Sequence, residues 1–336
     1  MEANKDIINS KINSILNSSE ILKGKSLDEI QSLLEEKKLN FKLIMSIVCK
    51  NEEDIIEQHI RFHKAMGVDG FIVLNNNSTD KTLSILEKLK DEGLVYEIIT
   101  TTTQTFEQNT WIKEMIGLAR NKYRADWIIN ADADEFYFSK SLNLKKSIKK
   151  ASDANVIKVE SIFLFPDNRD DYLSCPYFVT RPFYNFEVKL LELDKIDKNL
   201  KSYNYDISTD GVKVIHRFEG IKALHPGNHD IEMENKKMIN SSDISIYHYQ
   251  TKNYKGFEAK VLKWIDCIEL IPGEQCWHIK RLVNIYNEGK LLEEYESKYN
   301  EKIRNFLMQN GVVTIDPSVY NFMMYKGIIE KKTSTS

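Results

Sequence analysis

The residues best suited to chemistry are Asp132, Asp134 and Glu135, which directly follow the apolar run Trp127-Ile128-Ile129. Carboxylates this close repel one another and are costly to remove from water. Strand geometry would place Asp132 and Asp134 on one side, with their Cα atoms about 6.6 Å apart. They can share a hard divalent cation, or divide between a cation and a ribose hydroxyl. A Mg²⁺ or Mn²⁺ held in this way would neutralise a diphosphate leaving group. The alternative is an acidic turn facing water.

Two more polar segments follow apolar runs earlier in the chain. Lys50-Asn51-Glu52 comes after Leu43–Cys49, and the segment from Asn75 to Asp80 comes after Phe71–Leu74. Ser78 or Asp80 would also cap the helix that follows, whatever else the segment does. Ligands bind beyond the carboxyl ends of parallel strands, so three polar segments at three such ends predict one site.

The elements that must position these residues alternate between apolar strands and amphipathic helices. The pattern predicts an α/β fold, with a mostly parallel sheet flanked by helices. Expected strands cover residues 43–48, 71–74, 94–100, 127–129, 156–165 and 213–218, and expected helices cover 55–66, 79–90, 110–123, 257–270, 278–288 and 291–307.

Composition excludes several classes of protein. The formal net charge is −3 and no basic stripe is present, which argues against a nucleic-acid partner. No apolar run approaches the roughly 20 residues of a membrane span, and the N-terminus lacks a secretory pattern. The 4 cysteines have no C-x-x-C spacing, which fits a reducing compartment. We therefore expect a cytoplasmic protein; peripheral contact with the inner membrane face and oligomerisation stay open.

Four segments together resemble the family-2-like glycosyltransferases of GT-A fold: Cys49–Glu52, Asn75–Asp80, Gly117–Asn121 and Trp127–Phe136. The likeness is closest to the subgroup whose acidic motif reads Asp-x-Asp-Glu-Phe, and it covers about residues 43–138. It implies a nucleotide-sugar donor, usually a uridine diphosphate sugar, with Mn²⁺ or Mg²⁺. It also implies a hexosyl transfer, of inverting type, to a glycan or glycolipid hydroxyl, as in surface polysaccharide synthesis.

The resemblance also assigns roles to single residues. Cys49, Asn51 and Glu52 would line the nucleoside pocket, and Arg120 would face the nucleotide. Asp132 would approach the ribose and the metal, and Asp134 would bind the metal. Many members carry Asp where this chain has Asn75, at a position associated with the base edge. An amide both donates and accepts hydrogen bonds, so the preference for uracil is less secure here.

A histidine after the acidic motif completes the metal shell in many GT-A enzymes. His248, after the strand-like Ile244–Ile246, resembles that element, with Lys252 and Lys255 near enough to meet phosphate. His225 is the alternative. His59 and His63 lie on a helix face and are interpreted as packing residues.

The general base of an inverting transfer must accept the proton of the acceptor hydroxyl. The sequence does not mark it. Asp230 falls where related enzymes place their base, and Asp167 is the alternative.

The domain organisation predicted from these patterns has four parts. Residues 1–39 form a helical extension, and residues 40–235 form the GT-A domain, with a donor half over 40–138 and an acceptor half over 139–235. Residues 236–330 are mainly helical, and residues 331–336 are a disordered tail.

Three other functions compete with this interpretation. A haloacid-dehalogenase-like phosphatase also places Asp-x-Asp after a strand, but it requires Thr or Val where this chain has Phe136. A nucleotidyltransferase would carry a Gly-rich phosphate loop after the first strand, which is missing. A catalytically inactive nucleotide-sugar-binding scaffold of the same fold is opposed only by the intact acidic pair.

Overall fold

The computed structural model describes residues 39–101, 108–151, 153–180, 211–265 and 277–330. The chain divides into two units, residues 1–41 and 42–336, and the account below concerns the second. The expected helical extension, apart from Leu39, and the expected tail over 331–336 lie outside the described residues.

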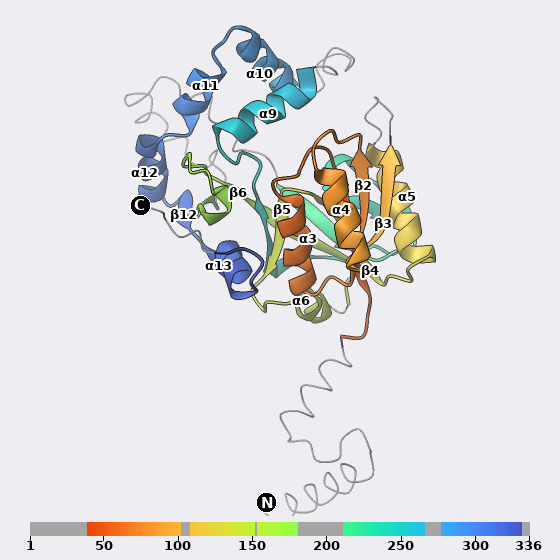
Figure 1. Cartoon of the computed structure of the whole chain (residues 1–336). Helices are drawn as coiled ribbons and strands as arrows, with labels where there is room; N and C mark the ends of the chain where they lie inside the picture. Colours follow the sequence, from red (N-terminus) through yellow and green to blue (C-terminus); the bar gives the residue numbers. More distant parts are fainter. Residues whose placement is uncertain (1–38, 102–107, 152, 181–210, 266–276, 331–336) are drawn as a thin grey trace, which may run out of the picture. The chain divides into compact units, whose positions relative to one another are not determined.

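Four parallel strands alternate with three helices in the donor half, as the sequence predicts (Figure 1). The strands lie side by side in the order β4, β1, β2, β3, and each neighbouring pair is parallel. This confirms the α/β class. The elements are β1 (Leu43–Cys49), α3 (Ile56–Ala65), β2 (Gly70–Asn76), α4 (Thr82–Asp91), β3 (Val95–Thr101), α5 (Gln108–Asn121) and β4 (Trp127–Asp132).

The core forms where alternate strand residues face one helix. Ile72 and Leu74 of β2 pack with Trp111 and Met115 of α5, and all four side chains are buried. The odd-numbered residues of β2, such as Val73, point to the opposite face because side chains alternate along a strand. Both faces of this half are therefore apolar, which explains the continuous hydrophobic runs in its strands.

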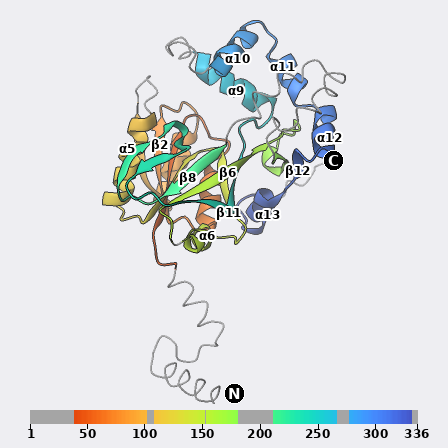
Figure 2. The ribbon, with the colours of Figure 1, turned by 180° about the vertical axis from the view of Figure 1, so that it is seen from behind.

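The sheet then continues with antiparallel and mixed pairings to ten strands. Strand β8 pairs antiparallel with β4, and β11 pairs antiparallel with β5 and parallel with β6 (Figure 2). Because β11 belongs to this sheet, the sheet extends past residue 235, where the sequence pattern placed its end; the domain limits themselves stay a prediction. The further strands are β5 (Glu135–Ser139), β6 (Val156–Leu164), β7 (Tyr177–Val179), β8 (Val212–His216), β11 (Met238–His248) and β12 (Val313–Ile315), and β9 (Ile221–Leu224) and β10 (Ile231–Met233) form a separate pair.

The remaining helices differ from expectation in two ways: α6 and α13 were not predicted, and one predicted helix is divided. The single helix expected over 291–307 is two helices, because Asn300 interrupts it and caps the second by accepting a hydrogen bond from the Ile303 amide at 2.9 Å. Among the described helices, none is long and apolar enough to cross a membrane. These helices are α6 (Leu144–Lys150), α9 (Tyr254–Ile265), α10 (Trp277–Asn287), α11 (Leu291–Lys298), α12 (Glu301–Gln309) and α13 (Ser318–Tyr325).

Candidate active site

The three polar segments meet at one edge of the sheet, as expected. The parallel register pairs Val48 with Asp132 and Cys49 with Asn75, so the carboxyl ends of β1, β2 and β4 lie level with one another. The segments that follow these strands therefore share a single surface of the molecule.

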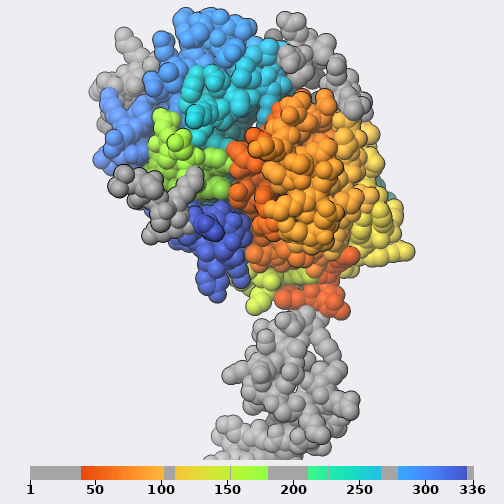
Figure 3. Space-filling view, in the orientation of Figure 1, coloured from red at the N-terminus to blue at the C-terminus, as the bar shows by residue number. Residues whose placement is uncertain are grey.

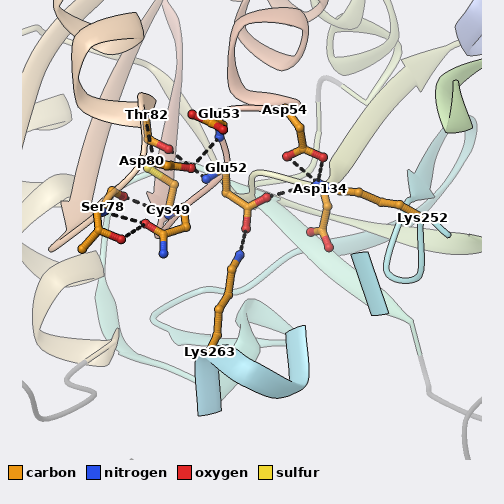
Figure 4. A network of polar contacts seen from close by, with 12 residues as sticks. Cys49, Glu52, Glu53, Asp54, Ser78, Asp80, Thr82, Asp134, Lys252 and Lys263 are labelled. Atoms are coloured by element: carbon orange, nitrogen blue, oxygen red, sulfur yellow. Dashed lines mark hydrogen bonds and ion pairs between the residues drawn. The ribbon is translucent and has the colours of Figure 1, made fainter. Parts of the chain in front are cut away.

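The loops after β1 and β2 are bound to each other (Figure 4). Asn51 has a positive φ of 54°, and its side-chain oxygen accepts a hydrogen bond from the Thr79 amide at 2.7 Å. The Asn51 amide in turn donates to the Ser78 hydroxyl at 2.9 Å. Asp80 accepts a hydrogen bond from the Thr82 amide at 2.9 Å, at the first residue of α4. The N-cap position itself is Lys81, which makes no side-chain cap, and α4 starts later than the sequence pattern predicts. These bonds fix the shape of the edge before any ligand arrives.

Glu52 faces two lysines that come from the far end of the chain. Lys263 on α9 lies 2.7 Å from the Glu52 carboxylate, and Lys252 lies 3.3 Å from it. Lys252 also pairs with Asp54 at 2.8 Å. In Figure 3 the cyan surface of α9 lies beside the orange surface of the donor half. Lys252 was expected near the site, whereas Lys263 was missed; Lys255 is exposed on α9.

Cys49 and Asn75 lie beneath these loops rather than on the open surface. The Cys49 thiol is buried 3.6 Å from the Leu74 carbonyl, and burial raises the pKa of this thiol far above its usual range. The side-chain oxygen of Asn75 is buried and has no hydrogen-bond partner within the described part of the chain. A buried acceptor without a partner is costly, and Asn75 therefore remains a candidate for contact with a ligand.

Asp132 is bound to a lysine that sequence reasoning missed. The Lys213 ammonium, on β8, lies 2.8 Å from the Asp132 carboxylate and 3.1 Å from the Glu135 carboxylate. Burial alone would lower the pKa of Lys213, but the two carboxylates raise it, so the ammonium stays charged. A lysine inside the apolar run Val212–His216 was the available signal, because a buried ammonium requires a partner.

Asp134 lies beside His248, the histidine favoured by the sequence. The His248 Nε2 is 3.5 Å from an Asp134 carboxylate oxygen. Burial would raise the pKa of Asp134, but the charge of His248 and its hydrogen bond lower it, with Lys260 and Lys252 acting in the same direction. His225 instead lies on a loop, 3.4 Å from Glu232. The structure thus brings His248, and not His225, to the acidic motif.

The fit to a divalent cation depends on these two residues. In the part of the chain that the structure describes, no three His, Cys, Asp or Glu side chains are placed to hold a metal together. Mg²⁺ is commonly bound by one or two carboxylates together with substrate phosphates and water. The Asp134 carboxylate fits such an ion. The His248 imidazole, whose pKa is raised by Asp134, becomes a second protein ligand only when it gives up its proton to a bound metal.

The two candidate bases are both ion-paired with a cation that lies close to them in the sequence. Asp167 contacts the Arg169 guanidinium at 2.5 Å and 2.8 Å. Asp230 lies 2.5 Å from the Lys236 ammonium. Burial would raise the pKa of each carboxyl, but the neighbouring cations and hydrogen bonds lower it below its usual range. Each carboxylate must lose its cation before it becomes an effective base.

Arg120 lies at the opposite edge of the sheet. It ends α5, and its guanidinium donates to the Phe218 carbonyl at 3.5 Å. Tyr123 follows shortly and donates to the Tyr96 carbonyl near the start of β3. A right-handed crossover helix ends near the amino end of the strand that follows it, which here is β4. Asp132 lies at the other end of β4, about 16 Å along the strand. The structure therefore does not bring Arg120 to the other site residues.

Two buried histidines, His59 and His63, contact the backbone of β5, which begins at Glu135 in the acidic motif. His59 Nε2 contacts the Glu135 carbonyl at 2.9 Å, and His63 accepts a hydrogen bond from the Tyr137 amide at 2.9 Å. Burial lowers the pKa of His59 to about 4, so this imidazole is neutral. Their predicted role as packing residues is confirmed.

A small hollow opens on the α5 side of β4, next to Asp132. Among the residues that line it, the Ser46 hydroxyl donates to the Asn130 side-chain oxygen at 2.6 Å. The Asn228 side-chain oxygen is buried at its rim, with no hydrogen-bond partner among the described residues. Sequence reasoning missed Asn228. The hollow is lined by Ser46, Val48, Ile112, Met115, Asn130, Ala131, Asp132 and Asn228.

Comparison with known proteins gives one family and several distant structures. None of the curated proteins matches the chain. Matching solved structures include S. aureus TarS 1-349, with 12% identity, a TM-score of 0.38, and 66% of this chain and 65% of that chain covered. The complex of that protein with UDP-GlcNAc has 13% identity, a TM-score of 0.39 and 66% coverage of each chain.

Glucosyl-3-phosphoglycerate synthase from Mycobacterium tuberculosis, in complex with Mn²⁺, UDP and phosphoglyceric acid, matches with 14% identity and a TM-score of 0.31. The match covers 55% of this chain and 59% of that one. The chain spans less than two thirds of each of these solved chains. The model of glycosyltransferase family 92 matches residues 45–301, which is more than half of the chain. The expected enzyme class is confirmed, and the chain belongs to glycosyltransferase family 92.

Proposed function

We propose that this chain transfers a hexosyl group from a nucleoside diphosphate sugar, with uridine diphosphate as the favoured carrier, to a hydroxyl of a glycan or glycolipid. The observation that carries the proposal is the meeting of Asp134 and His248, 3.5 Å apart, at the carboxyl edge of the sheet. Such an edge is where ligands of open α/β sheets bind. Family 92 supplies the reaction class, and this edge supplies the donor site.

Asp134 and His248 would hold a Mn²⁺ or Mg²⁺ ion. When bound, the ion would stabilise negative charge on the departing nucleoside diphosphate. Asp132 borders the hollow beside β4, and we assign it to the ribose of the donor. Lys252 and Lys263 lie at the same edge, paired with Glu52 and Asp54, and we propose that a diphosphate takes the place of these carboxylates as their partner.

The residue that acts as the base on the acceptor side is chosen from two candidates. An inverting transfer needs one base at the acceptor hydroxyl, and Asp230 is favoured over Asp167. Asp230 is about half exposed and Asp167 nearly buried against Arg169. Displacement of Lys236 from Asp230 by the acceptor would restore its basicity. We place the reaction in surface polysaccharide synthesis in the cytoplasm, with peripheral contact at the inner membrane face left to experiment.

The test is isothermal titration of the purified protein with UDP, GDP and ADP and their sugars, with and without Mn²⁺. Asp134→Asn is the site variant, and Asp153→Asn is a control on a described surface turn. We expect micromolar binding of a uridine nucleotide that requires Mn²⁺ and is lost only in Asp134→Asn. Absence of metal-dependent binding by every nucleotide would reject the proposal and favour an inactive scaffold.

A further inference from the structure

Lys213 is a buried ammonium in an otherwise apolar strand. Its side chain is 6% exposed, and its neighbours Val214 and Ile215 are fully buried. An unpaired ammonium in such a place is strongly disfavoured, so its partners are required by the fold. Those partners are the carboxylates of Asp132 and Glu135, at 2.8 Å and 3.1 Å.

These contacts divide the acidic motif into two pairs. Asp132 and Glu135 form the lysine-bound pair, which is closed further by a hydrogen bond from the Asp132 amide to Glu135 at 3.1 Å. Asp134 and His248 form the open pair, in which Asp134 lies between the two residues of the lysine-bound pair in the sequence; the described contacts of Lys213 are with Asp132 and Glu135. Glu135 is 1% exposed, whereas the Asp132 side chain is 38% exposed and borders the hollow.

We infer that Lys213 is a positioning residue that withholds Asp132 and Glu135 from the metal, so that the cation rests on Asp134 and His248 alone. This inference rests on the proposed function. An ammonium and a divalent cation compete for the same carboxylate oxygens, and the ammonium is tethered by its strand. It cannot leave without becoming a buried, unpaired charge. The Asp132 carboxylate, which is 38% exposed, then serves the hydroxyls of the donor.

This division removes the metal from the two roles that the resemblance gives to Asp132 and leaves it the ribose. With Lys213 in place, its ammonium offsets negative charge on the lysine-bound pair, which weakens the attraction of the pair for a second cation. The metal site would therefore use one carboxylate and one imidazole from the protein, and its other ligands would be phosphate oxygens and water.

The test measures Mn²⁺ binding directly, by electron paramagnetic resonance of free Mn²⁺ with the full chain and saturating UDP. We expect Asp134→Asn to weaken Mn²⁺ binding by at least about thirtyfold, as the loss of a metal ligand does. Asp132→Asn should leave the Mn²⁺ affinity within about threefold and instead weaken UDP binding by about tenfold.

Lys213→Met should raise the Mn²⁺ affinity by about tenfold or add a second bound Mn²⁺, because two carboxylates lose their resident cation. Lys213→Arg keeps the charge and should leave Mn²⁺ binding unchanged. Lys222→Met, an exposed lysine on β9, is the control. A merely structural lysine would not produce a gain in metal affinity. If Lys213→Met does not fold, the comparison of Asp132→Asn with Asp134→Asn decides by itself.

Equal losses of Mn²⁺ affinity in Asp132→Asn and Asp134→Asn would overturn the inference and leave the proposed function standing. A native protein that binds no Mn²⁺ with any nucleoside diphosphate would overturn the proposed function, and the inference with it.

Discussion

The imidazole of His248 lies 3.5 Å from the carboxylate of Asp134, although the two residues come from opposite halves of the chain. The contact is built by the pairing of β11 with β5, in which His248 lies opposite Glu135. The Tyr249 amide then donates to the Asp134 carbonyl at 2.8 Å and fixes the backbone on both sides. Because this contact is held by the sheet, we expect it to persist when a ligand binds.

Replacement of this histidine should separate the two candidates for the metal shell. We expect His248→Ala to lower kcat/KM by about 100-fold and to raise the Mn²⁺ concentration needed for activity, because one of two protein ligands is lost. His225→Ala should stay within about threefold. Donor hydrolysis measured over a Mn²⁺ titration checks both variants, and a larger loss in His225→Ala would show that the histidines are assigned the wrong way round.

Replacement of Arg120 should not change the affinity for the donor. Its guanidinium lies at the amino edge of the sheet, near Phe218, and does not reach the edge that carries Asp132. We expect Arg120→Ala to leave the dissociation constant for UDP within about twofold and to shift stability by less than about 0.5 kcal/mol, as exposed substitutions usually do. Calorimetric titration with UDP provides the check. A tenfold loss of affinity would restore the role implied by the resemblance.

Lys263 should contribute to donor binding through charge. Its ammonium lies 2.7 Å from Glu52, and Lys263→Met would leave Glu52 with Lys252 as its cation. We expect UDP binding to weaken by about tenfold and to lose part of its salt dependence. Lys290→Met, which removes an exposed lysine paired with Glu288, should change neither quantity. Titrations at low and high salt distinguish this outcome from a general loss of folding.

Acid should destabilise the protein through its buried histidines. Burial lowers the pKa of His216 to about 4, against a usual value near 6.5, so the unfolded chain binds a proton that the folded chain does not. Between about pH 6.5 and pH 4 the free energy of unfolding therefore falls as the pH falls. Each such histidine contributes about 1.4 kcal/mol per pH unit.

Substitution of His216 measures how much this residue contributes to the loss of stability in acid. Urea unfolding at several pH values should show a shallower fall in His216→Gln than in the native chain. His229→Gln, which changes an exposed histidine, should keep the native slope. If His216→Gln kept the native slope as well, His216 would have to be protonated in the folded protein.

The sequence by itself determined the alternating strands and helices of the donor half and the sheet edge that carries the polar segments. Apolar runs such as Leu43–Cys49 predict strands because the sheet is covered on both faces. Parallel strands bring their carboxyl ends to one edge, so the sequence alone places Asn51, Asn75 and Asp132 together. Arg120 was misplaced because the helix and loop before β4 decide which edge a helix end reaches.

Only the tertiary structure decided which charged groups meet at that edge. Lys213 reaches Asp132 because β8 lies antiparallel beside β4, and Lys263 reaches Glu52 because α9 lies against the donor half. These contacts join residues far apart in the chain. They depend on strand order and register across the whole sheet, which the local hydrophobic pattern of a segment does not encode.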